Sequence, residues 1–490
     1  MTILDLSGSW RCAYTRLGEA TYSYGDEQHE TLLRSYAETA QMPEEYAHTI
    51  RVPGFWDDQP ASFEGEDTAV NPDYVPVHFP MPDTPDASLP YIVGTVWYKR
   101  SFTLEDAAPH AALELAGVMT QARLWVNGSY AGRVSGYSTP HRMPLDGFLR
   151  KGENELLLAV SNDPQGHLGC ATRGYKGFSG GLYGPVTLRV TGKCRIADAA
   201  GFARDERFFT IDALFEGDVD AAELGYKVCD GLRVLKEGNF PVDGLSMRRD
   251  ILSIGLAPWS DSTPKLYELK LTLRDRSGVC DRLTLPLGLR TLRREGTRLT
   301  INRTPLFLRG STEHAYYPET CTAPADVGTY RKNLTVLRDW GFNFLRFHTS
   351  VPREACMQAA DELGLLIQFE APVGCTPREW EEIVRFARRH PSAAIACGGN
   401  EQLLDEKRIA ELSADARVSH ELAPALLYNP HEALRGVEYG WSDADMGERV
   451  QEPSPHNPHR LAALKGFSDV FGQTLTELAL ENPRVCAITA

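Results

Sequence analysis

The sequence predicts a multidomain protein of the β plus α/β class, in which two β-sandwiches precede an α/β unit. Three observations predict this class. The 490 residues suffice for about three domains at roughly 150 residues per domain. Short alternating segments bounded by turn residues fill about the first 290 positions, which is typical of sandwiches. After about residue 295, strand-like and helix-like segments alternate, which is typical of a parallel sheet covered by helices.

The two sandwiches follow from strand and turn patterns. Ala122–Val126 alternates apolar and polar residues, and Asn127–Gly128 follows as the strongest short hairpin signal, because both positions tolerate a positive φ. Such short strands predict a jelly-roll β-sandwich over residues 1–192. Tyr267–Leu273 alternates in the same way within a smaller unit, for which we predict an immunoglobulin-like β-sandwich over residues 193–292.

An incomplete (β/α)8 TIM-type barrel is predicted for residues 293–472. Apolar strands alternate with helix signals: an amphipathic pattern from about Ala325, Pro352 at the start of a helix, and a capping box at Thr376–Glu379. The stretch has room for about five or six βα units rather than eight. The four strands that we predict are Pro305–Gly310, Phe342–Phe347, Leu365–Phe369 and Ala393–Cys397.

Composition and charge exclude several classes of function. Lysine plus arginine number 51 and aspartate plus glutamate number 66, so the formal net charge is −15. Phosphate backbones and anionic membrane surfaces repel such an acidic chain, so we expect neither nucleic acid nor a membrane as a partner. No uninterrupted apolar run of about 18 residues predicts a membrane-spanning helix.

The N-terminus and the cysteines predict a cytoplasmic protein. Met1–Ser7 has neither a basic start nor a long apolar core, so we expect no secretion signal. The 10 cysteines form no C-x-x-C pair, which argues against a zinc site and against a dense disulfide framework. Free, mostly buried thiols in a reducing compartment are therefore expected. We predict no metal site and no cofactor.

Polar side chains follow each of the four predicted barrel strands. Because the chemistry of such barrels lies at the C-terminal ends of the strands, these residues are candidates for a functional site. Carboxylates with neutral polar neighbours suit acid/base work on sugars. No serine or cysteine stands with a partner base in a known spacing, and no glycine-rich phosphate loop follows a strand. The candidate residues are Glu313 and His314, Arg346 and His348, Glu370, and Asn400 and Glu401.

Several longer motifs resemble one known family. Gly94–Phe102 resembles the signature strand of a sugar-binding jelly roll, and His390–Ser392 followed by Gly399–Glu401 resembles an acid/base motif. With these motifs the chain resembles the family 2 glycoside hydrolases, which include β-galactosidases, β-glucuronidases and β-mannosidases. Further motifs that carry the resemblance are Leu124–Gly128, Gly180–Val186, Leu308–Gly310 with Glu313–His314, and Asn343–His348.

The resemblance implies a glycosidase that hydrolyses O-glycosyl bonds of terminal β-linked sugars. Glu401 would be the general acid that protonates the leaving oxygen, and then the base that activates water. Asn400 would hydrogen-bond the 2-hydroxyl beside the scissile bond. The resemblance also implies a homo-oligomer as one form of assembly. Further side chains that would shape the pocket or bind the carbohydrate substrate are His348, Arg346, His314 and Glu370.

The sequence offers one weak candidate for the second catalytic carboxylate. A retaining mechanism needs this group about 5 Å from the acid/base, and an inverting mechanism about 6.5–9.5 Å from it. Val437–Gly440 resembles a nucleophile motif, which makes Glu438 the candidate, although no apolar strand precedes it. An alternative function therefore stays open: a non-catalytic carbohydrate-binding protein or an inactive truncated hydrolase. Glu370 or Glu438 at about 5 Å from Glu401 in the fold would favour the enzyme.

The last residues resemble a different family. Asp469–Ala479 and Val485–Ala490 resemble the start of the pyrimidine-binding domain of 1-deoxy-D-xylulose-5-phosphate synthase, a thiamine-diphosphate enzyme. We therefore expect a truncated hydrolase with an atypical tail over residues 473–490. No diphosphate-binding segment accompanies the tail, and the first part of the chain is rich in predicted strands. The sequence thus argues against a thiamine-diphosphate enzyme.

Overall fold

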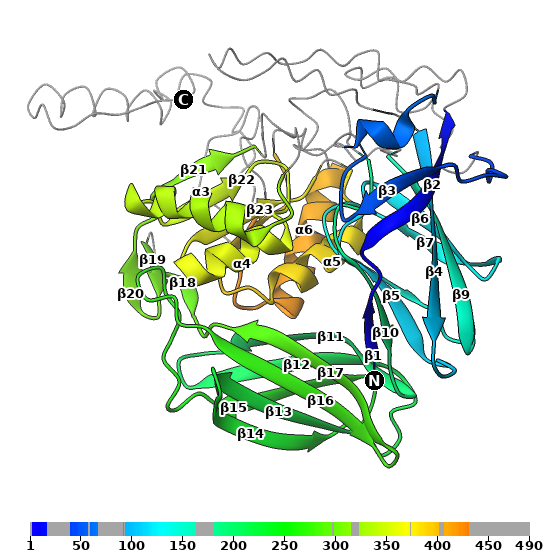
Figure 1. Cartoon of the computed structure of the whole chain (residues 1–490). Helices are drawn as coiled ribbons and strands as arrows, with labels where there is room; N and C mark the ends of the chain where they lie inside the picture. Colours follow the sequence, from blue (N-terminus) through cyan, green and yellow to red (C-terminus); the bar gives the residue numbers. More distant parts are fainter. Residues whose placement is uncertain are drawn as a thin grey trace, which may run out of the picture.

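The computed structural model describes most of the chain up to residue 430 (Figure 1). Glu401, Glu438 and the predicted tail lie outside the described residues, as does the last part of the predicted barrel. The described residues are 2–16, 40–56, 59–66, 92, 94–162, 180–295, 298–314, 323–372, 374–400 and 406–430.

Two antiparallel sheets form the first β-sandwich, drawn in blue to cyan in Figure 1. One sheet has six strands in the order β3-β2-β4-β9-β6-β7, and the other has four in the order β1-β10-β5-β8. A short 3-10 helix, η2 (Pro60–Phe63), follows β3. The strands are β1 (Thr2–Asp5), β2 (Gly8–Arg16), β3 (His48–Val52), β4 (Gly94–Leu104), β5 (Ala111–Leu115), β6 (Gln121–Val126), β7 (Ser129–Ser135), β8 (His141–Pro144), β9 (Gly152–Ser161) and β10 (Val186–Val190).

Apolar side chains from both of these sheets share one core. Trp10 and Leu158 come from the six-stranded sheet and Leu113 from the four-stranded sheet, and all three belong to the same buried cluster. Trp56 is fully buried in this cluster as well. Trp56 explains why residue 180 is a glycine, because a Cβ added at Gly180 would lie 1.4 Å from Cζ2 of Trp56. The backbone therefore passes directly over the indole ring.

The hairpin predicted at Asn127–Gly128 is confirmed. Strand β6 ends at Val126, β7 begins at Ser129, and these two residues pair across the hairpin. Asn127 has a φ of 51° and Gly128 a φ of 81°, which are the two positive values that a type I′ turn requires. The Asn127 side chain also donates a hydrogen bond of 3.1 Å to the carbonyl oxygen of Phe148. The turn is thus tied to the neighbouring loop.

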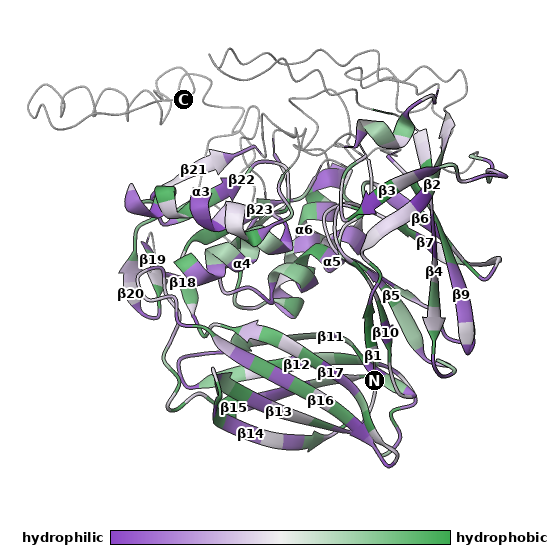
Figure 2. Ribbon diagram, viewed as in Figure 1, coloured by the Kyte–Doolittle hydropathy of each residue, from purple (hydrophilic) through white to green (hydrophobic). Residues whose placement is uncertain are grey.

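A second pair of antiparallel sheets follows, drawn in green in Figure 1, with the orders β11-β12-β15 and β14-β13-β16-β17. Buried residues alternate with exposed ones along β16, as predicted for Tyr267–Leu273, and Figure 2 shows this alternation in hydropathy. The sheets are consistent with two sandwich domains. Their jelly-roll and immunoglobulin-like topologies, and the domain bounds, stay predictions. The strands are β11 (Cys194–Ala203), β12 (Phe208–Gly217), β13 (Glu223–Asp230), β14 (Arg233–Pro241), β15 (Ser246–Leu252), β16 (Tyr267–Asp275) and β17 (Gly278–Leu287).

Five parallel strands in the order β21-β22-β23-β24-β25 form the last sheet. Apolar side chains of its strands and of four helices make one buried cluster. A small antiparallel sheet, β18-β19-β20, precedes it. The described residues thus hold part of the predicted barrel. The elements are β18 (Leu292–Glu295), β19 (Arg298–Ile301), β20 (Thr304–Leu306), β21 (Gly310–Glu313), α3 (Val327–Asp339), β22 (Phe344–Phe347), α4 (Glu354–Leu363), β23 (Leu366–Glu370), α5 (Pro377–Ala387), β24 (Ala393–Cys397), α6 (Glu406–Leu422) and β25 (Leu427–Asn429).

The first barrel strand does not lie at Pro305–Gly310, where the sequence predicts it. The start of this stretch belongs to β20, which pairs with β19 in an antiparallel hairpin, and the first parallel strand is β21. The physical reason is a tight turn at Asn302 and Arg303, whose φ values are 50° and 68°. This turn pairs Ile301 with Thr304. The apolar run therefore completes a hairpin before the chain enters the parallel sheet.

The helix starts follow the capping signals in the sequence. The Thr376 hydroxyl accepts the N–H of Glu379 at 3.2 Å, and the Glu379 carboxylate accepts the N–H of Thr376 at 3.0 Å, which confirms the capping box of α5. Asp326 caps α3, close to the start expected near Ala325. Pro352 differs from the prediction, because it precedes the N-cap of α4 instead of opening the helix. None of the described helices is both long and apolar enough to cross a membrane.

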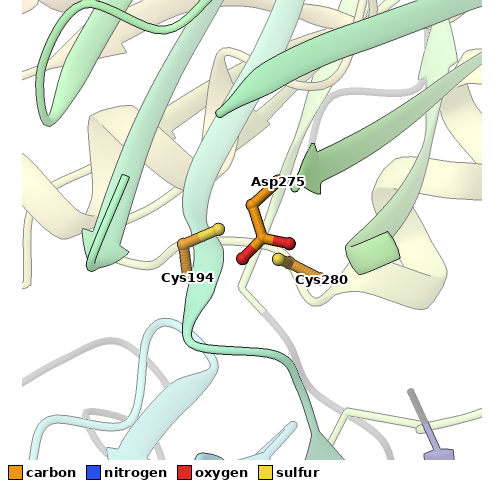
Figure 3. A group of neighbouring side chains, drawn as sticks. All are labelled: Cys194, Asp275 and Cys280. Atoms are coloured by element: carbon orange, nitrogen blue, oxygen red, sulfur yellow. The ribbon is translucent and has the colours of Figure 1, made fainter. Parts of the chain in front are cut away.

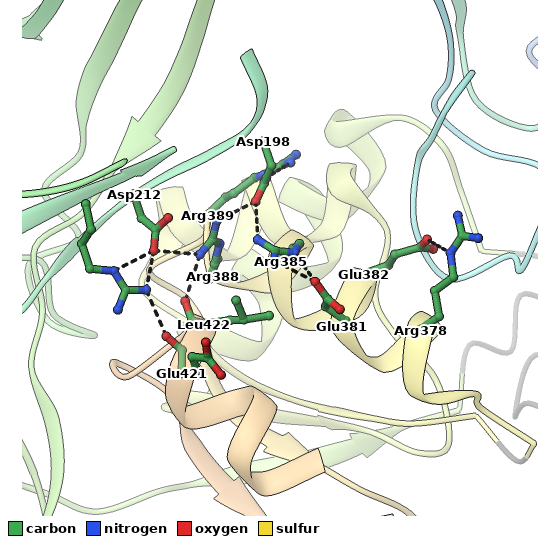
Figure 4. Close-up of polar contacts among 11 residues, drawn as sticks. Asp198, Asp212, Arg378, Glu381, Glu382, Arg385, Arg388, Arg389, Glu421 and Leu422 are labelled. Atoms are coloured by element: carbon green, nitrogen blue, oxygen red, sulfur yellow. Dashed lines mark hydrogen bonds and ion pairs between the residues drawn. The ribbon is translucent and has the colours of Figure 1, made fainter. Parts of the chain in front are cut away.

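A network of ion pairs fixes the second sandwich to α5 (Figure 4). Asp198 on β11 accepts from Arg388 at 2.5 Å and from Arg389 at 2.6 Å, and lies 3.3 Å from Arg385. Arg388 reaches Asp212 on β12 at 3.4 Å, and its side chain is almost completely buried. The ion pairs therefore tie the second sandwich to the C-terminal end of α5, the end that lies away from the start of the helix after β23.

We expect acid to weaken this network. Burial by itself raises the pKa of Asp198, but the charges of the nearby arginines, Arg389 first, have the larger effect. Together they lower the pKa from 3.8 to about 2. A lowered folded pKa contributes stability that is present above pH 3.8 and is lost as the pH falls through about 2. In urea unfolding, Asp198→Asn should cost about 2 kcal/mol at pH 5 and much less at pH 2. Asp106→Asn, which alters an exposed pair, is the control. An equal loss for Asp198→Asn at both pH values would contradict the expectation.

Candidate active site

The C-terminal ends of the parallel strands bring polar side chains from four segments to one edge of the sheet. Strand β21 ends at Glu313 and is followed by His314, and β22 carries Arg346 one residue before its end. Strand β23 ends at Glu370, and Asn400 follows β24. Because neighbouring strands in this sheet are parallel, their ends lie on the same side. The grouping of strand-end residues predicted from the sequence therefore exists in the fold.

Arg346 connects three of these segments through its guanidinium group. Its Nε donates to Oε1 of Glu370 at 2.5 Å, and its Nη2 donates to Oδ1 of Asn400 at 2.7 Å. One cation thus holds a carboxylate from β23 and an amide from the segment after β24. The planar fork of an arginine suits such a bridge, because its donors keep a fixed geometry.

Glu370 is completely buried, and both of its carboxylate oxygens accept hydrogen bonds. Besides the bond from Arg346, Oε1 accepts from Nε2 of Gln368 at 3.3 Å, and Oε2 accepts from the backbone N–H of Thr349 at 2.7 Å. A buried carboxylate is tolerated when it is paired and fully hydrogen-bonded. The carboxylate therefore acts as a fixed anchor for Arg346.

Two partners of Glu370 were not found from the sequence. Thr349 has a φ of 46°, a left-handed value that is strained for a β-branched residue and often occurs at functional sites. This conformation accompanies the hydrogen bond from its N–H to Glu370. Gln368 lies two residues before Glu370 in β23, so it faces the same side of the sheet. A polar residue within the apolar run Leu365–Phe369 was the signal that could have revealed it.

Two histidines stand beside Arg346. The rings of His314 and His348 have centroids 4.8 Å apart, and Nδ1 of His348 lies 3.4 Å from Nη2 of Arg346 and 3.7 Å from Oε2 of Glu370. Desolvation, and then the charge of Arg346, lower the pKa of His314 below its usual value. At neutral pH the His314 ring is therefore uncharged, and it offers neutral donor and acceptor atoms to a ligand.

The amide nitrogen of Asn400 has no hydrogen-bond partner among the described residues. The Asn400 side chain is buried with the residue 4% exposed, and Oδ1 accepts from Arg346. Its Nδ2 is buried and has no hydrogen-bond partner in the described part of the chain. An unsatisfied buried donor costs about 1–3 kcal/mol, so it is an obvious point for a ligand oxygen. Glu401, the next residue, and Glu438 lie outside the described residues.

The described residues at this edge do not gather a set of three side chains able to hold a metal ion. Within the described part of the chain, one such set exists, formed by Cys194, Asp275 and Cys280. It belongs to the second sandwich and not to this edge, since Cys194 lies on β11, Asp275 on β16 and Cys280 on β17. The strand-end residues instead offer an arginine, two imidazoles, an amide and a buried carboxylate, a combination that suits the recognition of hydroxyl groups.

The first sandwich is matched by a family model. The model is described as glycosyl hydrolases family 2, sugar binding domain, and it matches residues 3–168. The first part of this chain is therefore similar to that family's sugar-binding domain.

Curated relatives extend the similarity beyond this domain. The β-galactosidase of Lactococcus lactis is 26% identical over 455 residues, which cover 86% of this chain and 43% of that protein. The β-galactosidase of Thermoanaerobacter pseudethanolicus is 26% identical over 301 residues, which cover 56% of this chain and 39% of that protein. The chain thus spans about two fifths of the length of these relatives.

Solved structures share the fold. A glycosyl hydrolase family 2 member from Bacteroides cellulosilyticus aligns with a TM-score of 0.65 at 17% identity, covering 89% of this chain and 57% of that chain. A β-glucuronidase from Bacteroides uniformis aligns with a TM-score of 0.62 at 19% identity, covering 87% and 52% respectively. These likenesses support the order of two sandwiches followed by a parallel sheet with helices.

We expect Glu370→Gln to destabilise the protein by about 2 kcal/mol, because the variant removes a buried charge that pairs with Arg346. Urea unfolding at pH 7 measures the change. Glu382→Gln is the matched control, since it breaks a pair in which Arg378 is 88% exposed, and such pairs contribute less than about 1 kcal/mol. Equal stabilities for the two variants would show that Glu370 does not anchor Arg346.

Proposed function

We propose that this chain is a glycoside hydrolase of the β-galactosidase/β-glucuronidase type, with Glu401 as the general acid and base. The observation that carries the proposal is the Arg346 network, which holds Asn400 at the polar edge of the parallel sheet with a free amide N–H. Glu401 follows Asn400 directly. The family 2 match and the β-galactosidase relatives support the same reaction class.

Each side chain of the network has a role in this proposal. Asn400 donates its free amide N–H to a sugar hydroxyl beside the scissile bond, while Arg346 keeps the amide in place. Glu401 protonates the leaving oxygen and then removes a proton from the attacking water. An acid that works near neutral pH needs a raised pKa, which a partly desolvated mouth supplies. His314 and His348 contact the substrate at the neighbouring strand ends.

Glu370 has a positioning role in this proposal. Its two oxygens already accept hydrogen bonds from Arg346, Gln368 and Thr349, and it is completely buried. A nucleophile must approach the anomeric carbon of the sugar, so a fully engaged carboxylate is poorly suited to that task. Glu438 remains the candidate nucleophile.

A second candidate function is carbohydrate binding without hydrolysis. The observation that favours it is that the family model matching residues 3–168 is that of a sugar-binding domain. Both functions predict sugar binding, and only the first predicts turnover.

Hydrolysis of a panel of chromogenic β-galactosides, β-glucuronides and β-mannosides separates the two functions. We expect activity on one sugar, and a fall of about a hundredfold or more in kcat/KM for Glu401→Gln, because the amide has no proton to donate. The matched control is Glu421→Gln, an exposed carboxylate at the end of α6. No turnover by the folded wild-type chain, combined with measurable sugar binding, would replace the hydrolase by the binding function.

Asn400→Ser tests the free amide directly. We expect the product sugar to bind about fivefold more weakly, because one hydrogen bond is worth about 1 kcal/mol. Isothermal titration calorimetry with the sugar that the panel selects, or with galactose and glucuronate when none is cleaved, measures the affinity. Asn239→Ser on exposed β14 is the control. An unchanged affinity would remove Asn400 from the site.

A further inference from the structure

A second cluster of chemically active side chains lies in the second sandwich, away from the sheet edge described above. Cys194 is the first residue of β11, Asp275 the last residue of β16, and Cys280 the third residue of β17. Figure 3 shows the two sulfur atoms and the carboxylate turned toward one another. One sulfur, one carboxylate oxygen and the other sulfur lie within 4.8 Å of one another. We propose that these three residues bind a divalent zinc ion.

Local structure explains why residues far apart in the sequence meet here. Asp275 pairs with Gly278 at the end of the β16–β17 hairpin, so the hairpin carries both Asp275 and Cys280. The backbone N–H of Gly192 donates a hydrogen bond of 2.8 Å to the carbonyl oxygen of Cys280. This bond holds the segment before β11 against β17, and it brings Cys194 to the hairpin.

Asp275 is the member of the cluster whose surroundings favour a cation most. Its side chain is 1% exposed. Oδ1 accepts the N–H of Ser277 at 2.7 Å and its hydroxyl at 2.6 Å, whereas Oδ2 is buried and has no nitrogen or oxygen donor within hydrogen-bond distance in the described part of the chain; the Cys280 thiol is its neighbour. The nearest cation, Nζ of Lys193, lies 3.8 Å from Oδ2 and is held at 2.9 Å by Asp218. Because a buried carboxylate oxygen without a donor is costly, a metal ion at this position would satisfy it.

The ligand types and spacing suit zinc. Zinc binds thiolate sulfur at about 2.3 Å and carboxylate oxygen at about 2.0–2.2 Å, so its ligand atoms lie about 3.5–3.8 Å apart in a tetrahedron. The 4.8 Å limit of the cluster requires the ligand atoms to approach one another by at most about 1.3 Å to reach this geometry. Calcium and magnesium take oxygen ligands and would leave both sulfurs unused. A water molecule would complete the fourth position.

Charge and proton balance are consistent with a dication. Burial, and then the neighbouring Cys280 thiol, raise the pKa of Cys194 to about 12, so the Cys194 thiol carries a proton when no metal is bound. Each thiol releases its proton to solvent as its sulfur bonds to zinc. Two thiolates and one carboxylate around a dication leave one negative charge at the site. Zinc affinity should therefore fall as the pH is lowered.

The same two thiols could instead form a disulfide by giving up two electrons and two protons to an oxidant. The Asp275 carboxylate favours zinc binding over a disulfide. A disulfide leaves Oδ2 of Asp275 without a partner, whereas a zinc ion uses it. The ion would also fasten the start of β11 to the β16–β17 hairpin, close to the connection between the two sandwiches, and so stabilise the second sandwich.

Titration of the reduced, chelator-treated full chain with zinc chloride tests the proposal. We expect one equivalent to bind and Tm to rise with zinc concentration, because zinc binds the folded state. Cobalt(II) should give thiolate-to-metal charge-transfer absorption. Cys194→Ser and Cys280→Ser should abolish zinc binding and the cobalt–thiolate absorption. Lys193→Ala should weaken zinc binding roughly tenfold, and Asp275→Asn should weaken it by more. Cys229→Ser is the matched control, because Cys229 is also buried in this sandwich and stands outside the cluster.

Several outcomes would overturn the proposal. One is a reduced, folded wild-type chain that binds no zinc and shows no cobalt–thiolate absorption. Another is binding that survives in Asp275→Asn and in both cysteine variants, which would assign the ion to other cysteines. A third is a Cys194–Cys280 disulfide in the freshly isolated chain, found by mass spectrometry of peptides, together with no zinc binding after reduction. Because the cobalt spectrum uses the wild-type chain, a cysteine variant that fails to fold does not prevent a decision.

Discussion

The guanidinium group of Arg346 is the constraint on which the polar edge of the parallel sheet depends. It pairs with Glu370, a carboxylate with no exposed surface, and holds the side chain of Asn400. A buried charge must be paired and hydrogen-bonded, so each member of this set limits where the others can lie. The strained backbone of Thr349 is part of the same arrangement, because its N–H supplies a donor that the Glu370 carboxylate needs. Within the described part of the chain, the Nδ2 of Asn400 is a buried donor without a partner, as is the Thr349 hydroxyl.

A second set of buried charges joins the second sandwich to the C-terminal end of α5. Asp198 faces three arginines near the C-terminal end of the helix, and Arg388 links it to Asp212 on the next strand. The attraction is strong because the carboxylates and Arg388 are removed from water. The sandwich therefore does more than precede the parallel sheet in the sequence, since its charges hold the helix that packs on β23 and β24.

The two sites differ in how they satisfy buried polar atoms. At the sheet edge, both oxygens of Glu370 accept hydrogen bonds from protein donors. The amide nitrogen of Asn400 has no partner among the described residues and can donate to an oxygen-rich ligand. In the second sandwich, Ser277 donates to only one oxygen of Asp275, and two sulfurs lie within 4.8 Å of a carboxylate oxygen of this residue. An unmatched donor is suited to a hydroxyl group, whereas an unmatched acceptor between thiols is suited to a soft cation. The two proposals therefore rest on separate observations.

The sequence by itself determined the local features that depend on neighbouring residues. It predicted the Asn127–Gly128 hairpin, the capping box at Thr376 and the strand at Ala393–Cys397, because turn chemistry and periodicity are short-range properties. It also placed the candidate residues at strand ends. It misplaced the first parallel strand, since Asn302 and Arg303 adopt positive φ values that their residue types alone did not signal. Only the tertiary structure decided that the end of β23 and the segment after β24 both contact Arg346. It alone brought the thiols of Cys194 and Cys280 close together, because such contacts depend on how distant strands pack.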